Sequence, residues 1–130
     1  QNIIPKKIEL KLNKRKKYTR AYIFYNENNE ILLRKRTSKG MLASMLEVPN
    51  DRWEIDKKKL IYDKMIINLK SKIQLMGKIS YSFSHFDLEI DVYLAKVKKK
   101  IFLNHKWIKK EQINKSGLPT VMKKIIEVAL

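Results

Sequence analysis

The sequence predicts one α+β domain in which a mixed β-sheet is flanked by helices. Three observations support this fold class. Segments with strand-like alternation are interspersed with segments of helical periodicity. Their order along the chain is strand, strand, helix, hairpin, strand, helix. The length of 130 residues suits a single domain with a core of its own.

Residues 79–94, ISYSFSHFDLEIDVYL, are predicted to form two strands with a break between them. Large apolar side chains occupy odd positions up to Phe83 and even positions from Phe86 onward. One uninterrupted strand cannot bury both sets, because successive side chains point to opposite faces. The chain must therefore turn or bulge at Ser84 and His85. Two interpretations stay open: a hairpin corner facing water, or a recognition loop held by a rigid scaffold.

The first part of the chain is predicted to be a lead-in followed by a hairpin. Residues 1–17 are expected to be a basic linker, and residues 18–130 the folded domain. Residues 20–25 (RAYIFY) and 31–36 (ILLRKR) predict two strands joined by the turn 27–30. Because both faces of RAYIFY are largely apolar, this hairpin is expected at the centre of the sheet.

The remaining elements follow from periodicity and capping residues. Residues 41–48 are apolar, and either a helical turn or an irregular core loop fits them. A helix is predicted over about 57–73, with Asp56 as its N-cap. Residues 103–108 predict a short last strand, and Pro119 begins a final amphipathic helix.

The charge of the chain points to polyanionic partners. Thirty Lys and Arg against thirteen Asp and Glu give a net charge of +17, a field that attracts nucleic acid first and anionic membranes second. A Lys-rich composition caused by an AT-rich genome is the alternative explanation. No apolar run approaches the roughly 20 residues of a membrane span. The candidate contacts to a DNA backbone are Lys14, Arg15, Lys16, Lys17, Arg34, Arg36 and Lys39.

The residues of a catalytic or metal site are missing from the sequence. There is no cysteine, hence no disulfide, thiolate nucleophile or Cys-ligated cluster. Asp87, Glu89 and Asp91 share one strand face and are expected to face solvent rather than hold a cation. The predicted helix 57–73 has one carboxylate, Asp63, whereas a pyrophosphate-cleaving metal site needs several. We therefore expect no catalytic residues and no metal. The opening QNIIPKK lacks an initiator Met, which suggests a piece of a longer chain.

Three segments together resemble a known family. They are residues 40–49 (GMLASMLEVP), residues 83–85 (FSH), and residues 107–108 (WI) followed by 118–124 (LPTVMKK). In this order they are similar to the C-terminal domain of the A/G-specific adenine DNA glycosylases, the MutY family, over about 18–130. Leu46 and Val48 stand where that family usually has Trp and Phe, which alters the packing under the first segment.

The resemblance implies a Nudix-like fold that has lost the Nudix catalytic box. It also implies a role in base excision repair, which is the recognition of 8-oxoguanine opposite adenine. Adenine removal, a glycosidase (hydrolase) reaction, would belong to an N-terminal helical domain with an iron–sulfur cluster, so this fragment alone is expected to have neither activity nor cofactor. The implied partners are duplex DNA with an 8-oxoguanine:adenine mispair and that catalytic domain. We expect a monomer with no membrane partner, cytoplasmic and nucleoid-associated in a bacterium.

The lesion-binding residues implied by the resemblance are Phe83, Ser84 and His85. Guanine presents N7 as an acceptor, and oxidation at C8 turns this position into a donor. A serine hydroxyl can accept from the new N7–H, but it can also donate to undamaged N7. Discrimination should therefore need a fixed backbone group nearby, with Phe83 buried to hold the turn and His85 against the nucleotide or a phosphate. The alternatives are an active Nudix-type hydrolase of oxidised nucleotides and a basic nucleic-acid- or protein-binding module.

Overall fold

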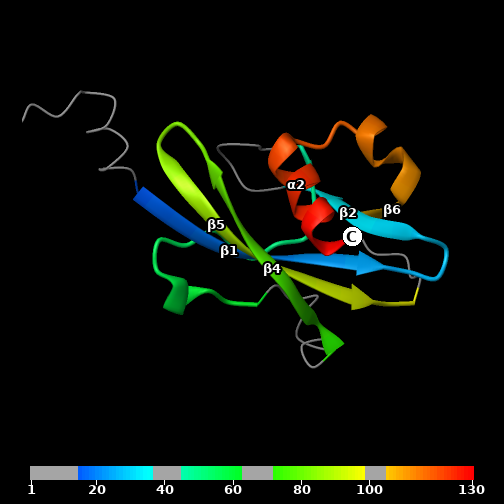
Figure 1. The fold of residues 1–130 in the computed structure, drawn as a ribbon, viewed down its shortest axis with the longest axis horizontal. Coiled ribbons are helices and arrows are strands. Elements are labelled where there is room, and N and C mark those ends of the chain that lie inside the picture. The colour runs from blue at the N-terminus through cyan, green and yellow to red at the C-terminus, as the bar shows by residue number, and fades with distance from the viewer. Residues whose placement is uncertain (1–14, 37–44, 63–71, 99–104) are drawn as a thin grey trace, which may run out of the picture.

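The computed structural model describes residues 15–36, 45–62, 72–98 and 105–130. Within these ranges a mixed six-stranded sheet carries one α-helix on one face (Figure 1). The elements in chain order are β1 (Arg15–Tyr25), β2 (Glu30–Lys35), β3 (Leu46–Glu47), the 3₁₀ turn η1 (Lys57–Lys59), β4 (Gln74–Ser82), β5 (Phe86–Lys96), β6 (His105–Lys109), the 3₁₀ helix η3 (Lys110–Lys115) and α2 (Thr120–Ala129). The predicted α+β class is confirmed.

The strand order is β3-β2-β1-β5-β4, with β6 pairing β2, so β1 lies at the centre as predicted. β1 runs antiparallel to β2 and parallel to β5. The parallel register extends from Arg15 opposite Phe86 to Tyr25 opposite Lys96. The last three residues of the expected lead-in, 15–17, therefore belong to β1, and residues 1–14 lie outside the described ranges.

The turn between β1 and β2 is formed by Asn26 and Asn29. The Asn26 side-chain oxygen accepts from the backbone N–H of Asn28 at 2.9 Å and of Glu30 at 3.2 Å. Asn29 has φ 57°, which Asn tolerates better than most residues. The predicted first hairpin is confirmed, and its turn chemistry follows from local sequence.

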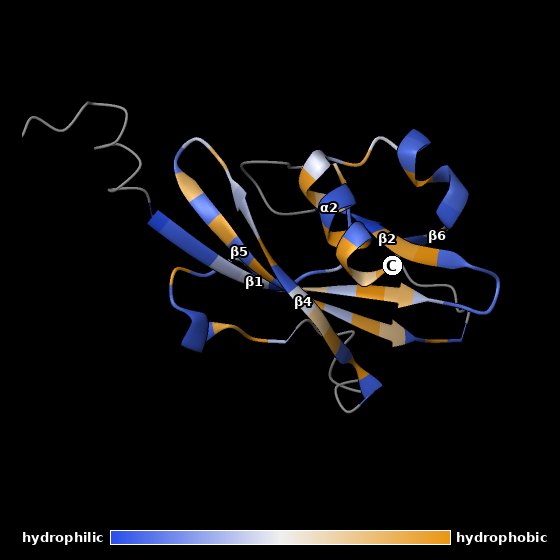
Figure 2. Cartoon of the chain, in the orientation of Figure 1, coloured by the Kyte–Doolittle hydropathy of each residue, from blue (hydrophilic) through white to orange (hydrophobic). Residues whose placement is uncertain are grey.

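Apolar clusters form on both faces of the sheet. Successive side chains of β1 belong to different clusters. Ala21 and Ile23 pack under α2, whereas Tyr22 and Phe24 lie on the other face. Figure 2 shows that β1 begins hydrophilic and becomes apolar further along. The predicted apolar face of α2 is confirmed, since its buried residues are Val121, Met122, Ile125, Ile126 and Ala129.

The predicted helix over 57–73 is corrected at its start. Asp56 does act as an N-cap, accepting from the N–H of Lys58 at 3.0 Å, but only a 3₁₀ turn of three lysines follows. None of the three is buried, so no apolar face holds a longer helix there. Residues 60–62 are not helical, and residues 63–71 lie outside the described ranges. Gly77 lies inside β4 beside a register shift.

Two predicted segments, residues 41–48 and 103–108, fall partly outside the described ranges. Residues 41–44 lie outside the described ranges, and Leu46–Glu47 pairs with β2 as a strand. The last strand is confirmed from His105 onward. No helix in the described ranges is both long and apolar enough to cross a membrane.

Candidate nucleic-acid interface

The break in strand alternation at Ser84 and His85 is a tight hairpin turn. The N–H of Phe83 donates to the carbonyl of Phe86 at 2.8 Å and closes the turn between β4 and β5. Tyr81 pairs with Leu88, and Ile79 with Ile90, so the odd residues of β4 and the even residues of β5 share one face. Ser84 and His85 are exposed at the tip, as the pattern predicted.

Four aromatic rings support this turn from the α2 side of the sheet. The ring centroid of Phe83 lies 4.9 Å from Phe86, 5.1 Å from Tyr81 and 5.7 Å from Trp53. The Trp53 indole N–H donates to Asn50 Oδ1 at 2.9 Å, which fixes its orientation. Phe83 is half-buried rather than fully buried. We call these four residues the aromatic cluster.

Basic residues reach the aromatic cluster from other elements. Because β1 is parallel to β5, its basic start lies beside the beginning of β5, at the same end of the sheet as the tip (Figure 1). Lys17 Nζ lies 4.5 Å from the ring centroid of Phe86. Lys124 Nζ, from α2, lies 5.5 Å from that of Tyr81. Arg15 is exposed at the start of β1.

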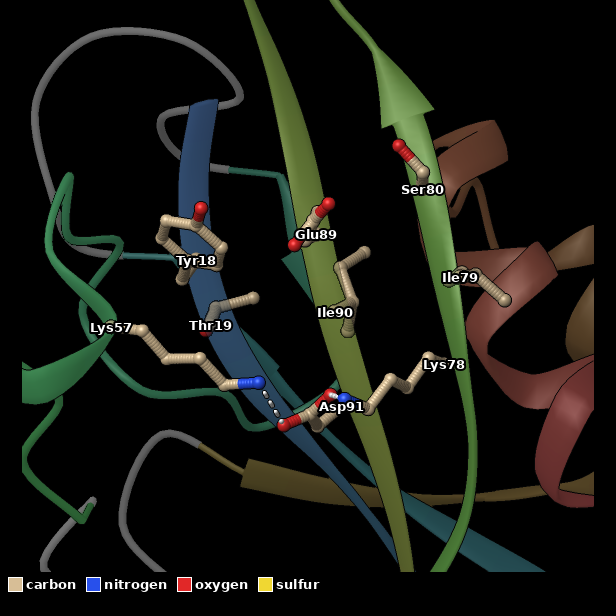
Figure 3. A pocket seen from close by; sticks show the side chains of 9 residues that line it. All are labelled: Tyr18, Thr19, Lys57, Lys78, Ile79, Ser80, Glu89, Ile90 and Asp91. Carbon is tan, nitrogen blue, oxygen red and sulfur yellow. Dashed lines mark ion pairs between the residues drawn. The ribbon is translucent and has the colours of Figure 1, made fainter. Parts of the chain in front are cut away.

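The opposite face of the same strands carries acidic residues in ion pairs. Lys16 Nζ lies 3.4 Å from Glu89, and Lys57 and Lys78 lie 3.5 and 3.9 Å from Asp91. Figure 3 shows Lys57 and Lys78 reaching Asp91 from either side. The charge of Asp91 is the main cause of the raised pKa of Lys57.

The expectation that Asp87, Glu89 and Asp91 face solvent is therefore corrected in part. They do lie on the face away from α2, and the Glu89 side chain is 42 % exposed, but the Asp91 side chain is only 15 % exposed. Asp87 accepts from the Ser82 hydroxyl at 2.7 Å. Glu89 and Asp91 line a cavity of about 370 Å³. No group of three or more His, Cys, Asp or Glu suited to a metal ion occurs among the described residues.

Arg34 and Arg36 both bind a buried carboxylate within the domain. Arg34 Nε donates to Glu47 Oε2 at 2.8 Å, and Arg36 donates to Glu47 Oε1 at 2.7 Å. Their side chains are 18 % and 13 % exposed, and Arg36 stacks 4.3 Å over Trp53. Since the buried Glu47 engages both guanidinium groups, neither arginine is proposed to bind a phosphate.

The remaining candidates for contacts to a DNA backbone differ in where they lie. Lys14 and Lys39 lie outside the described residues. Lys16 pairs with Glu89, which leaves Arg15 and Lys17 on β1 at the tip end. Sequence reasoning missed the contacts of Trp53 and of Lys124. They connect segments far apart in the chain, so no local spacing could reveal them.

A second buried ion pair stabilises the middle of β1. Arg20 donates to Asp51 and lies 3.6 Å over the Tyr62 ring. Burial alone would lower the pKa of Arg20, but the hydrogen bond and charge of Asp51 outweigh it and raise that pKa. The Tyr22 hydroxyl donates to the same carboxylate at 2.7 Å. Burial, assisted by Asp51, raises the pKa of Tyr22 far above its usual range.

The sheet and the helix α2 that covers it are typical of a known domain class. The family described as NUDIX domain matches residues 20–128, so the chain belongs to the NUDIX domain family. No curated protein sequence matches the chain.

Solved structures show the same fold at low sequence identity. The C-terminal domain of mouse MUTYH, in complex with human PCNA, superposes with TM-score 0.70 at 17 % identity, covering 88 % of each chain. The MutT protein from Methanosarcina mazei gives 0.66 at 14 %, covering 88 % of this chain and 93 % of that one. The NUDIX domain of Shewanella oneidensis NrtR, complexed with ADP ribose, gives 0.65 at 14 %, covering 98 % and 92 %.

Proposed function

We propose that this chain is the lesion-recognition domain of an adenine DNA glycosylase and reads 8-oxoguanine opposite adenine in duplex DNA. The observation that carries the proposal is the exposed Ser84-His85 tip, closed by a backbone hydrogen bond and supported by the aromatic cluster. The fold likeness to the MUTYH C-terminal domain supports it. Adenine removal is then catalysed by a separate glycosylase domain.

The tip offers the donors and acceptors that the oxidised purine edge requires. The Ser84 hydroxyl can accept from the N7–H that oxidation creates. The backbone N–H groups of Ser84 and His85 make no hydrogen bond with the backbone of another described residue, and either can donate to the new oxygen on C8. Undamaged guanine lacks both features. The pair of contacts discriminates where the hydroxyl alone would not.

The test compares binding of duplexes carrying 8-oxoguanine:adenine and guanine:adenine, with the domain joined to its glycosylase partner. Replacing both Ser84→Ala and His85→Ala should bring the preference close to unity, because a well-made base contact contributes roughly 1–3 kcal/mol. Ser82→Ala is the matched control, since its hydroxyl is engaged by Asp87 on the other face. An unchanged preference in the double variant, or an equal decrease in the control, would refute the assignment.

An active Nudix-type hydrolase is the second candidate function. The fold likeness to the M. mazei MutT protein and the cavity on the sheet face favour it. Incubating the chain with oxidised nucleoside triphosphates and Mg²⁺ distinguishes the two. Turnover would favour the hydrolase, and its absence together with a lesion preference would favour the recognition domain.

A further inference from the structure

At the hairpin tip, the lysines on the two faces of the sheet differ in the groups that they contact. Side chains alternate along a strand, so neighbouring Lys16 and Lys17 on β1 point to opposite faces. Lys17 lies on the α2 side over Phe86, and Lys16 lies on the far side with Glu89. The cations on the two faces therefore have different surroundings.

On the α2 side, Lys17 and Lys124 are cations with no carboxylate partner in the part of the chain that the structure describes. Each lies over a ring of the aromatic cluster, and neither forms an ion pair with another described residue. The ring beneath each side chain holds it without neutralising its charge. Lys124 is exposed, and Lys17 is partly so. Side chains held in this way lose less conformational freedom when they bind a phosphate.

On the far side, the lysines are already paired with Glu89 and Asp91. A phosphate approaching this face meets Asp87 and Glu89 close to the tip, on the strand that carries it. Like charges repel, and the lysines there would have to give up a carboxylate first. This face is unfavourable for a DNA backbone.

We propose that the DNA backbone docks on the α2 side of the tip, with Lys17 and Lys124 each contacting a phosphate. This inference rests on the proposed function and adds the side from which the duplex approaches. Because the two lysines come from β1 and α2, they bind the DNA strand at separate points near Ser84 and His85. They supply affinity and orientation, whereas the tip supplies selectivity.

The test measures duplex binding by the 130-residue chain at several salt concentrations. The slope of log K against log salt should fall by about 0.9 for each phosphate that the protein no longer binds. Lys17→Gln and Lys124→Gln should each show this, with affinity about eightfold lower near 0.1 M salt, as follows from the same relation. Lys16→Gln is the matched control, with the same charge change on the adjacent residue, and should leave the slope unchanged.

Two further measurements keep the test decisive. Lys17→Arg should restore the slope, which excludes misfolding as the cause of the weaker binding. The ratio between lesion and undamaged duplexes should stay the same in all lysine variants. Equal slopes for Lys16→Gln and Lys17→Gln, or binding that does not depend on salt, would overturn the docking side. Absence of any lesion preference in the domain joined to its glycosylase partner, with the slope pattern of the chain intact, would refute the proposed function instead.

Discussion

Arg34 on β2, Arg36 directly after it, and Lys17 and Lys124 near the tip are all cations, yet their surroundings differ. The arginines are mostly buried and share the carboxylate of Glu47. The lysines lie over aromatic rings with no carboxylate partner among the described residues. A planar guanidinium suits buried pairs because it is weakly hydrated and binds carboxylates with several donors. A net charge of +17 therefore overstates the charge available to a partner.

The largest expected effect comes from removing the carboxylate that binds the two arginines. Glu47→Ala leaves Arg34 and Arg36 with little solvent and without this counter-charge, and should lower the free energy of unfolding by about 3–5 kcal/mol. Urea denaturation measures this. Glu89→Ala is the control, because its pair with Lys16 is exposed and should contribute less than about 1 kcal/mol. Similar decreases in both variants would contradict the comparison.

An intermediate effect is expected at the other buried carboxylate. Tyr22→Phe removes a buried hydrogen bond to Asp51 and should cost about 2 kcal/mol at neutral pH. Because the folded state raises the pKa of Tyr22, the associated stability is present below about pH 10, where free tyrosine ionises, and is lost as pH rises above it.

Denaturation curves from neutral to alkaline pH check the sign of this effect. Stability of the unmodified chain should fall more steeply above about pH 10 than that of Tyr22→Phe. Tyr25→Phe, on the same strand but half-buried, should behave like the unmodified chain. Parallel alkaline decreases in all three proteins would show that Tyr22 ionises freely.

The smallest effect separates the two kinds of cation directly. Arg36→Lys should cost about 1 kcal/mol, because an ammonium cannot both stack on Trp53 and bind Glu47 as a guanidinium does. Lys17→Arg should change stability by no more than about 0.5 kcal/mol, as surface replacements usually do. Thermal unfolding of both variants measures the difference. A larger decrease for Lys17→Arg would show that Lys17 is a structural residue.

Local patterns predicted much of the fold. The change of phase at Ser84 and His85 predicted the turn, the apolar stripe predicted the buried face of α2, and the two-sided apolar strand predicted a central β1. Each of these depends on residues a few positions apart, where side-chain direction is determined by strand or helix geometry. The helix begun at Asp56 was wrong at its start because a cap without an apolar face does not sustain a helix.

The site depended on contacts that sequence spacing does not reveal. The binding of Arg34 by Glu47, the ion pair of Lys16 with Glu89, and the position of Lys124 over Tyr81 each join separate elements. From composition alone, all basic residues near a strand end are equivalent. Only the register of β1 against β5 decides which of them face the tip.

The parallel pairing of β1 with β5 also has a consequence for biosynthesis. A ribosome releases β1 long before β5 exists, so one edge of the future central strand stays bare while the middle of the chain is made. Non-local pairings of this kind form slowly. The lysines at the start of β1 discourage foreign strands from adding to that edge in the interval. The same residues would thus protect the nascent chain before they serve the finished protein.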